Sequence, residues 1–399
     1  MGIGNIANTG MRAAMTDMEI ISNNIANANT IGYKRSYGTF SDVYPNGAGG
    51  SSMQAGLGVA LTSIHQDFTR GGALYTNNPL DLMIGNNGFF VLKDDSNGAV
   101  SYTRAGRFAL DNEGYITNGK QRLQGFPASN GVVSAGGTLS DVKISSAPRN
   151  ATATSSVSED LNLNSTSEVK VGPFDKDDVE TYNYMTSKNV YDSLGNAHSM
   201  STYFVKDADN SWTANVLVDD VAVGTGTVQF STDGTMQSVT GLDALTFDPG
   251  TGAQSPQSFQ VSLDNISQYA SDNTTRFMSQ DGYPVGNLNG YEVDVNGNVV
   301  GTYSNEERVL LGKIAVAEFQ SVDGLASIGN MSWLETTSSG APILNPKNSD
   351  KNITASVVET SNVDLTQEMI ALIGAQHNFQ ANAQVEQTYN EVMQTVIKI

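Results

Sequence analysis

The sequence predicts a multidomain α+β protein with paired N- and C-terminal helices, which form a coiled-coil-like inner domain, and with two nested, mostly antiparallel β domains. Three observations support this fold class. Both ends of the chain carry long amphipathic patterns. The 399 residues exceed the roughly 250 to 300 at which a single hydrophobic core stops growing. Between the ends, short β-type runs alternate with turns rich in Gly, Asn and Asp.

The N-terminal helix is predicted from an unbroken heptad seam, in which apolar residues recur at alternating steps of four and three. The seam consists of Ala7, Met11, Ala14, Met18, Ile21, Ile25 and Ala28. Its alanines allow a second helix to approach closely. The helix is expected to end near Ala28 or Asn29, because Asn tolerates the left-handed conformation of a helix C-terminus and Gly32 soon follows.

The C-terminal helix is predicted from a second long apolar pattern. Its residues are Leu365, Met369, Leu372, Phe379, Val385, Tyr389, Val392, Val396 and Ile399. Because the N-terminal stripe requires a cover and the chain offers a plausible one only at its far end, the two termini are predicted to lie together. Both stripes are narrow, which suits a packed array of subunits better than a globular core. The residues of both patterns are therefore candidate subunit-interface residues.

The domain boundaries are predicted from shifts in composition and from the strand pattern. The expected parts are an inner helical domain (1–30 and 361–399), a connector (31–71 with 359–360), a first β domain (72–144 and 285–358) and an outer acidic β domain (145–284). The two arms of the first β domain are expected to meet because neighbours along a chain usually become neighbours in space. The outer domain is then an insertion. Within the connector, residues 45–52 are a flexible loop by composition.

The clearest strands lie in the second half of the chain. In the outer domain, strands are expected at 199–205, 212–218 and 221–230. In the first β domain, residues 291–303 predict a hairpin whose turn is Asn296-Gly297, and another strand follows within 310–319.

Composition excludes several classes of function. The net charge of −20 and the pI of about 4.3 oppose binding to nucleic acid or to anionic lipid. Residues 145–285 hold 18 acidic and 6 basic side chains and therefore carry most of this excess. The absence of cysteine excludes disulfides and thiolate metal sites. No secretory signal pattern and no apolar run long enough to span a membrane is expected.

An enzyme is not expected. A Ser-x-x-Lys motif at 167–170 and a Ser-Asp-Asn motif at 271–273 resemble those of penicillin-binding enzymes, but no Lys-Thr-Gly follows and neither serine opens a predicted helix. The three histidines, His65, His198 and His377, are too scattered to predict a zinc site. Residues 294–298 faintly resemble a calcium loop but are better explained as a hairpin turn. We therefore predict no catalytic residues, no metal and no cofactor.

Both ends of the chain carry motifs that resemble those of a known family. The N-terminal motif is the run NNIANANTIGYK, with Asn23, Asn24, Asn27, Thr30, Gly32, Tyr33 and Lys34. It resembles the signature near the N-terminus of bacterial flagellar rod and hook proteins, and residues 361–385 resemble the matching C-terminal segment. Residues 190–206 are similar to the outer domain of the hook members specifically. One departure is His377, where the family commonly has Arg, so the charge of one interface position differs.

The resemblance implies a structural subunit of the flagellar hook, a curved and flexible tube that transmits torque from motor to filament. It also implies an extracellular location, with the hook attached to the basal body, and export without a cleaved signal peptide. The implied partners are further copies of the chain, the distal rod protein, the hook cap, the hook-filament junction protein and the flagellar export apparatus. Among the alternatives, a distal rod protein lacks the outer insertion, and a β-rich surface adhesin does not explain the paired amphipathic ends.

Overall fold

The structure is a computed structural model that describes residues 3–43, 56–85, 87–129, 131–133, 138–250, 252–345 and 353–397. The chain divides into two compact units. Unit 1 comprises Met1–Ser145, Tyr291–Gly301 and Val309–Ile399, and unit 2 comprises Ser146–Gly290 and Thr302–Arg308. The predicted loop at 45–52 and the predicted seam residue Ile399 lie outside the described residues.

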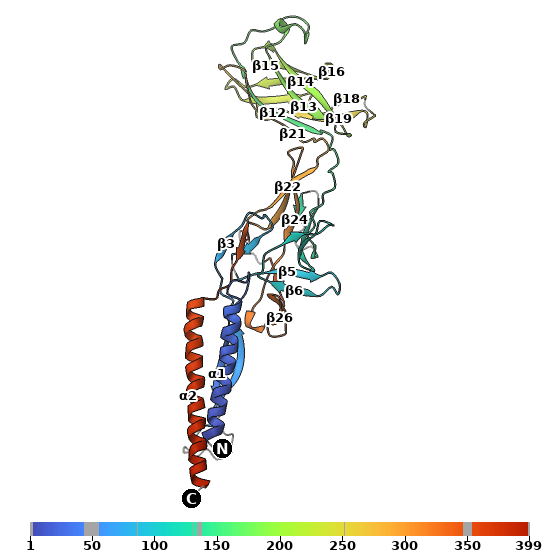
Figure 1. Cartoon of the computed structure of the whole chain (residues 1–399). Coiled ribbons are helices and arrows are strands. Elements are labelled where there is room, and N and C mark those ends of the chain that lie inside the picture. Colours follow the sequence, from blue (N-terminus) through green and yellow to red (C-terminus); the bar gives the residue numbers. More distant parts are fainter. Residues whose placement is uncertain are drawn as a thin grey trace. The chain divides into compact units, whose positions relative to one another are not determined.

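Two long helices occupy the ends of the chain, as predicted. Helix α1 (Ile3–Ala26) and helix α2 (Leu365–Ile397) lie side by side and antiparallel, with the two chain ends near each other (Figure 1). Helix α1 ends two or three residues before the expected position and continues into turns. The left-handed residue that follows is Gly32, whose φ is +72°.

Helix α1 is also covered by a β-hairpin that the sequence analysis did not predict. Strand β1 (Ser36–Asp42) pairs antiparallel with β2 (Val59–Gln66). A Cβ added to Gly38 of β1 would lie 3.2 Å from Ile20 of α1, and the Val59 amide donates a hydrogen bond to the Thr9 hydroxyl (3.3 Å). Ser, Gly, Thr and Asp dominate the sequence of β1, so its composition is that of a loop although its backbone pairs as a strand.

A sheet of fourteen described strands holds most strands of unit 1. Its main path is β22 (Leu288–Val293), β23 (Asn298–Tyr303), β24 (Arg308–Ile314), β9 (Gln121–Ser129), β5 (Phe89–Asp94), β6 (Val100–Thr103), β27 (Ser332–Leu334) and β26 (Ala326–Gly329). The branches are β7 (Ala109–Leu110), β8 (Ile116–Asn118), β10 (Val132–Val133), β11 (Ser140–Asp141), β25 (Val316–Glu318) and β28 (Ile343–Leu344). The pairs β24·β9, β25·β5 and β27·β6 join two distant arms of the chain.

Two short ladders join the same arms close to the helices. Strand β3 (Ala73–Tyr75) pairs antiparallel with β30 (Val357–Glu359), and β4 (Leu82–Ile84) pairs antiparallel with β29 (Ile353–Ala355). The main core of unit 1 is aromatic, because Phe68, Phe89 and Trp333 meet edge to face with ring centroids 5.4–5.7 Å apart.

The predicted hairpin with the Asn296-Gly297 turn is confirmed between β22 and β23. The Asp294 carboxylate accepts hydrogen bonds from the amides of Asn296 (2.8 Å) and Asn298 (2.9 Å), and Gly297 has a φ of +77°. This carboxylate therefore closes the turn with its own backbone, as the sequence analysis preferred.

Unit 2 contains two packed sheets. The first is antiparallel throughout and consists of β13 (Tyr184–Tyr191), β14 (Ala197–Ala208), β15 (Ser211–Val218), β16 (Val221–Phe230) and β17 (Met236–Thr240), which confirms the three strands predicted here. The second consists of β18 (Leu245–Phe247), β19 (Gln257–Ser262), β12 (Ser156–Asn164), β20 (Ser267–Tyr269) and β21 (Thr274–Gln280). Strand β12 pairs parallel with β19 and β20, so this sheet is mixed.

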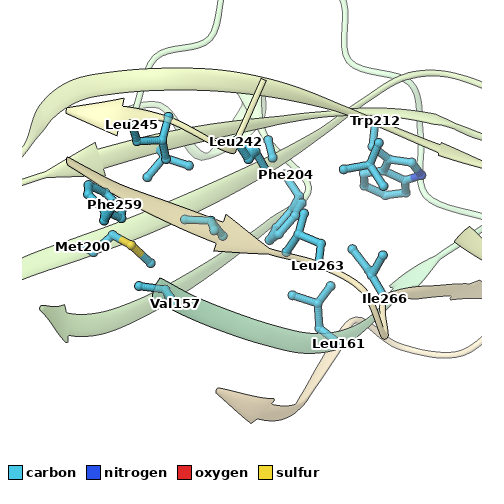
Figure 2. Close-up of a cluster of buried hydrophobic side chains, with 14 of the residues drawn as sticks. Val157, Leu161, Met200, Phe204, Trp212, Leu242, Leu245, Phe259, Leu263 and Ile266 are labelled. Atoms are coloured by element: carbon cyan, nitrogen blue, oxygen red, sulfur yellow. The ribbon is translucent and has the colours of Figure 1, made fainter. Parts of the chain in front are cut away.

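The core of unit 2 lies between these sheets and is almost wholly apolar. Figure 2 shows side chains from β12, β14, β15 and β19 directed into one cluster, among them Val157, Phe204 and Phe259. Trp212 is fully buried there, and its indole N–H donates a hydrogen bond to Gln268 (2.7 Å). A sequence so acidic therefore keeps its charge on the surface of this unit, with one exception.

The exception is Glu159 on β12, whose side chain is buried. Its carboxylate accepts hydrogen bonds from the hydroxyls of Thr202 (2.7 Å) and Thr186 (2.9 Å). No cation pairs with it among the described residues, whereas its neighbour Asp160 pairs with Arg276. Burial raises the pKa of Glu159, and the two threonine hydrogen bonds offset only part of that effect.

Glu159→Gln is expected to stabilise unit 2 at neutral pH. A raised folded-state pKa means that the native unit gains stability as the pH falls through that pKa towards the ordinary value of 4.5, and loses it as the pH rises. Gln removes the charge and keeps the hydrogen bonds, and each unit of pKa elevation corresponds to about 1.4 kcal/mol. Hydrogen exchange of β12–β15 in the full chain measures this; the exposed Glu168→Gln is the control. Equal protection of wild type and variant at pH 7 would contradict the expectation.

Candidate functional site: the terminal helix pair and its junction

The predicted seam of α1 is divided between two environments. Ala7, Ala14 and Ile21 are buried within the chain, at spacings of seven residues. The alternate positions, which are Met11, Met18, Ile25 and Ala28, are half-buried. Half of the seam therefore remains available for a contact outside the chain.

Glycines allow the close approach of α1 and α2 towards the chain ends. A Cβ on Gly10 would lie 2.6 Å from the Asn382 side chain, and a Cβ on Gly4 would lie 3.1 Å from Glu386 and Tyr389. These distances are too short for a side chain, so the two helix backbones pack here at a spacing that only Gly permits. Sequence analysis had assigned close packing to the alanines and missed these glycines.

The predicted apolar residues of α2 lie on two faces. Leu372, Phe379 and Tyr389 are half-buried, in a series with the buried Glu368 and Ala375 that follows the heptad spacing. The remaining predicted residues are exposed: Leu365, Met369, Val385, Val392 and Val396. A second stripe of α2 is thus apolar and uncovered within the single chain.

Two shallow grooves mark these uncovered faces. The first has a volume of about 520 Å³ and is lined by Ala381, Gln384, Val385, Thr388, Tyr389 and Val392 of α2. The second, of about 410 Å³, is lined by Met15, Met18, Glu19 and Ser22 of α1. Apolar grooves on exposed helices are suited to receive other helices, because burial of their side chains then adds to stability.

The N-terminal motif forms a polar junction where the helix pair meets the β structure. Asn24 is fully buried, and its amide donates to the carbonyl of Ser36 (2.7 Å) and to the carboxylate of Glu368 (3.1 Å). Its carbonyl accepts from the Ser36 amide (2.9 Å) and the Tyr33 hydroxyl (3.1 Å). One side chain therefore fixes α1, α2 and β1 to each other.

The centre of the junction is a buried group of three charges. Lys34 donates to the Glu359 carboxylate and to the Thr69 carbonyl, both at 2.7 Å, and its side chain and that of Glu359 are 0% and 1% exposed. The Gly71 amide also donates to Glu359 (2.8 Å), and Arg104 approaches its other oxygen at 3.5 Å. Burial alone would raise the pKa of Glu359, but Lys34 and Arg104 outweigh it and hold that pKa below its usual value.

A second ion pair lies beside the first. Arg35 contacts the buried carboxylate of Glu368 at 2.5 Å, and the Arg35 amide donates to Asn362 (2.8 Å). The Asn362 side chain in turn donates to the carbonyl of Asp67 (2.8 Å). The N- and C-terminal motifs are therefore bound to each other through charged and amide groups.

The other motif residues shape the turn that enters this junction. Asn27 donates to the side chain of Asn23 (2.8 Å), and the Thr30 hydroxyl donates to Asn27 (3.1 Å). At Gly32 an added Cβ would lie 2.6 Å from the Ala105 amide, and the Gly32 amide donates to the Glu359 carbonyl (2.8 Å). The motif is thus an intramolecular lock within unit 1.

Sequence analysis missed the partners of this lock, which are Arg104, Glu359, Asn362 and Glu368. Asn362 and Glu368 fall in the C-terminal motif, and that resemblance was the available signal. Arg104 and Glu359 carried no signal, because nothing in one sequence links a charge at 104 to charges at 34 and 359.

The groups considered for chemistry are engaged in structural contacts. His198 is buried between Asp219 (2.6 Å) and Asp192 (3.4 Å), and His65 bonds to Ser63 (2.7 Å). His377 is exposed on α2. The Ser271 hydroxyl accepts from Asn162 (3.0 Å), and neither it nor Ser167 begins a helix.

Two searches of the described part of the chain gave negative results. No group of three or more His, Cys, Asp or Glu side chains there has an arrangement that holds a metal ion. No helix among those residues combines the length and the apolar composition needed to cross a membrane.

Four family models match the chain in sequence order. They are the flagellar basal body rod protein (5–34), the flagellar hook protein FlgE/F/G D1 domain (83–160), the flagellar basal body protein FlaE D2 domain (162–283) and the flagellar basal body rod FlgEFG protein C-terminal segment (354–399). The first and last coincide with α1 and α2, and the FlaE D2 model lies within unit 2.

Full-length relatives give the same result. The chain is 36% identical to the flagellar hook protein FlgE of Escherichia coli K12 and 30% identical to that of Borreliella burgdorferi, with 98% of each chain covered in both cases. The crystal structure of Helicobacter pylori flagellar hook protein FlgE2 matches 72% of this chain and 99% of its own with a TM-score of 0.54 at 14% identity, which is a likeness of fold. On the identity and coverage of its relatives, the chain belongs to the flagellar hook protein family.

Proposed function

We propose that the chain is the structural subunit of a bacterial flagellar hook and that its activity is to polymerise. The observation that carries this proposal is the second apolar stripe of α2, which the single chain leaves uncovered although α1 and the β1–β2 hairpin cover other faces of the helix pair. In a homopolymer, neighbouring copies would cover this stripe. Family membership supports the assignment to the hook, and a structural protein requires no active site.

Within this proposal the half-buried residues of α1 and the exposed residues of α2 supply the contact between copies. Ala7, Ala14 and Ile21 act indirectly, because they are buried within the chain and hold α1 in place. The junction around Lys34 and Glu359 then joins the inner helices to the β structure of the same subunit. The inner helical domain, the connector, the first β domain and the outer acidic domain have the boundaries given above.

The surroundings of the subunit follow from the same proposal. The chain would be extracellular, in the hook attached to the basal body, and would leave the cell through the flagellar export apparatus without a cleaved signal peptide. Its heterologous partners would be the distal rod protein, the hook cap and the hook-filament junction protein. A distal rod subunit is the alternative, and the match of residues 162–283 to the FlaE D2 model disfavours it.

Electron microscopy of the concentrated full-length protein tests this function. We expect tubes from the wild-type chain and none from the double variant Val385→Glu with Val392→Glu, because each would bury an unpaired carboxylate at the contact, which costs several kcal/mol. Circular dichroism should show unchanged helix content in the monomer, since both positions are exposed there.

Gln387→Glu is the matched control, because it adds the same charge to an exposed position outside the lining of the α2 groove. It should form tubes. Abundant tubes from the double variant would rule out the α2 stripe as the contact, and a wild-type chain that stays monomeric at high concentration would contradict the proposed function.

A further inference from the structure

Arg104 has two hydrogen-bond donors that the described part of the chain does not use. It directly follows β6, and its side chain is 1% exposed. Only one of its terminal nitrogens approaches an acceptor, Glu359, at 3.5 Å. Its Nε and Nη2 are buried and have no hydrogen-bond partner. A buried charged donor without an acceptor is costly, so such groups require an explanation.

The single carboxylate beside Arg104 is already shared. Glu359 accepts from Lys34 and from the Gly71 amide at shorter distances, 2.7 Å and 2.8 Å. The other charges that act on Arg104 are Arg70, which opposes it, and Glu318. Burial lowers the pKa of Arg104, and these carboxylates compensate for only part of the effect.

A pocket of about 400 Å³ in unit 1 reaches this arginine. Its lining includes Tyr37, Phe68, Asn87, Arg104 and Asp323. Asp323 lies in the short helix η2 (Val322–Gly324) and is exposed. The pocket thus combines aromatic walls, a buried cation and one carboxylate at its surface.

We propose that the Nε–Nη2 edge of Arg104, in the wall of this pocket, is a binding site for a carboxylate. These two nitrogens form one edge of the guanidinium, where two parallel N–H groups match the two oxygens of a carboxylate. The Phe89 ring, 5.0 Å from the guanidinium carbon, supports the group from one face. The carboxylate comes either from an acidic side chain of a second copy of the chain, which rests on the proposed polymer, or from a small free carboxylate.

The site is tested by NMR of ¹⁵N-labelled full-length monomer, with the arginine Nε–H signals followed as sodium acetate is added. Sodium chloride at equal ionic strength is the reference. We expect one signal to shift saturably with acetate and not with chloride, and Arg104→Lys identifies it by its loss. Asp323→Asn should tighten acetate binding about five-fold, because it removes a like charge within several ångströms of the site.

A second variant covers the case in which Arg104→Lys does not fold. Val322→Phe places a larger side chain on a wall of the pocket and leaves Arg104 unchanged. It should keep the Arg104 signal and remove the response to acetate. Arg70→Lys, which alters a nearby cation outside the pocket lining, should retain the response.

Solid-state NMR of the polymer separates the two sources. A polymer in which the Arg104 signal differs from that of the monomer and ignores acetate assigns the site to an acidic side chain of a second copy. A polymer signal that still responds to acetate assigns it to a free carboxylate. If acetate shifts no arginine signal in the monomer beyond the effect of chloride, and the Arg104 signal is the same in polymer and monomer, the proposed site is wrong, whether or not the chain polymerises.

Discussion

Glu359→Gln is expected to lower the free energy of unfolding of unit 1 by about 3–5 kcal/mol, because it leaves two buried cations without their shared anion. Lys34 and Glu359 are 0% and 1% exposed, so water does not replace the lost charge. The measurement is thermal or denaturant unfolding of the full chain, with hydrogen exchange of β3 and β30 to report on unit 1. These strands adjoin Glu359 directly.

The control for this substitution is Glu113→Gln. Glu113 pairs with Arg122 at 3.4 Å but its side chain is 67% exposed, so the loss of its charge should cost less than about 1 kcal/mol. The double variant Lys34→Met with Glu359→Leu should recover part of the stability, because it removes both members of the buried pair. Equal effects of Glu359→Gln and Glu113→Gln would contradict the role assigned to the junction.

The same group makes unit 1 sensitive to acid. The pKa of folded Glu359 lies below its ordinary value of 4.5, so its contribution to stability is complete above that value and is lost as the pH falls through the folded-state pKa. Unit 2 should respond in the opposite direction over part of this range because of Glu159. Hydrogen exchange at a series of acidic pH values should therefore show β3 and β30 losing protection before β12 does.

Ile21→Asp is expected to separate the helix pair and to abolish the polymer. Ile21 is 4% exposed and lies in the buried half of the seam, so an aspartate there is a desolvated charge with no cation bonded to the neighbouring seam positions Ala14 and Ala7. The cost is several kcal/mol, which exceeds what an isolated helix can absorb. Circular dichroism should show a loss of helix, and electron microscopy a loss of tubes.

Ser22→Asp is the matched control, since Ser22 is the next residue of α1 and is exposed. It should retain the helix content and the protection of α1. Hydrogen exchange should also show that β12–β15 of unit 2 are unaffected by Ile21→Asp, because these strands belong to another compact unit. Normal tubes from Ile21→Asp would show that the seam does not support assembly.

The parts of the fold that were predictable are those with strong local patterns. The seam of α1 and the hairpin around Gly297 follow from periodicity and turn chemistry, which act over a few residues. Strand β1 was not predictable, because its polar residues become a strand only through pairing with β2. The parallel pairing of β12 with β19 was hidden for the same reason, since partners about 100 residues apart leave no mark on either segment.

The candidate site shows the same division. The apolar pattern of α2 was visible, but which of its residues contact α1 and which stay exposed depends on the direction from which α1 approaches. The resemblance marked Lys34 and Gly32 without giving their role. Their role depends on Glu359, which lies more than 300 residues away in sequence and 2.7 Å away in space.

This separation along the chain sets an order of events. A chain that emerges N-terminus first, from a ribosome or through a narrow channel, presents Lys34 long before Glu359 and α2 have appeared. The junction is then incomplete, and α1 has no cover from α2 until nearly the last residue is out. Contacts between such distant segments are slow to form because the closing loop is long. The lock at Glu359 therefore works as a completeness check: the helix pair that would join a growing tube forms only in a chain that has been delivered to its end.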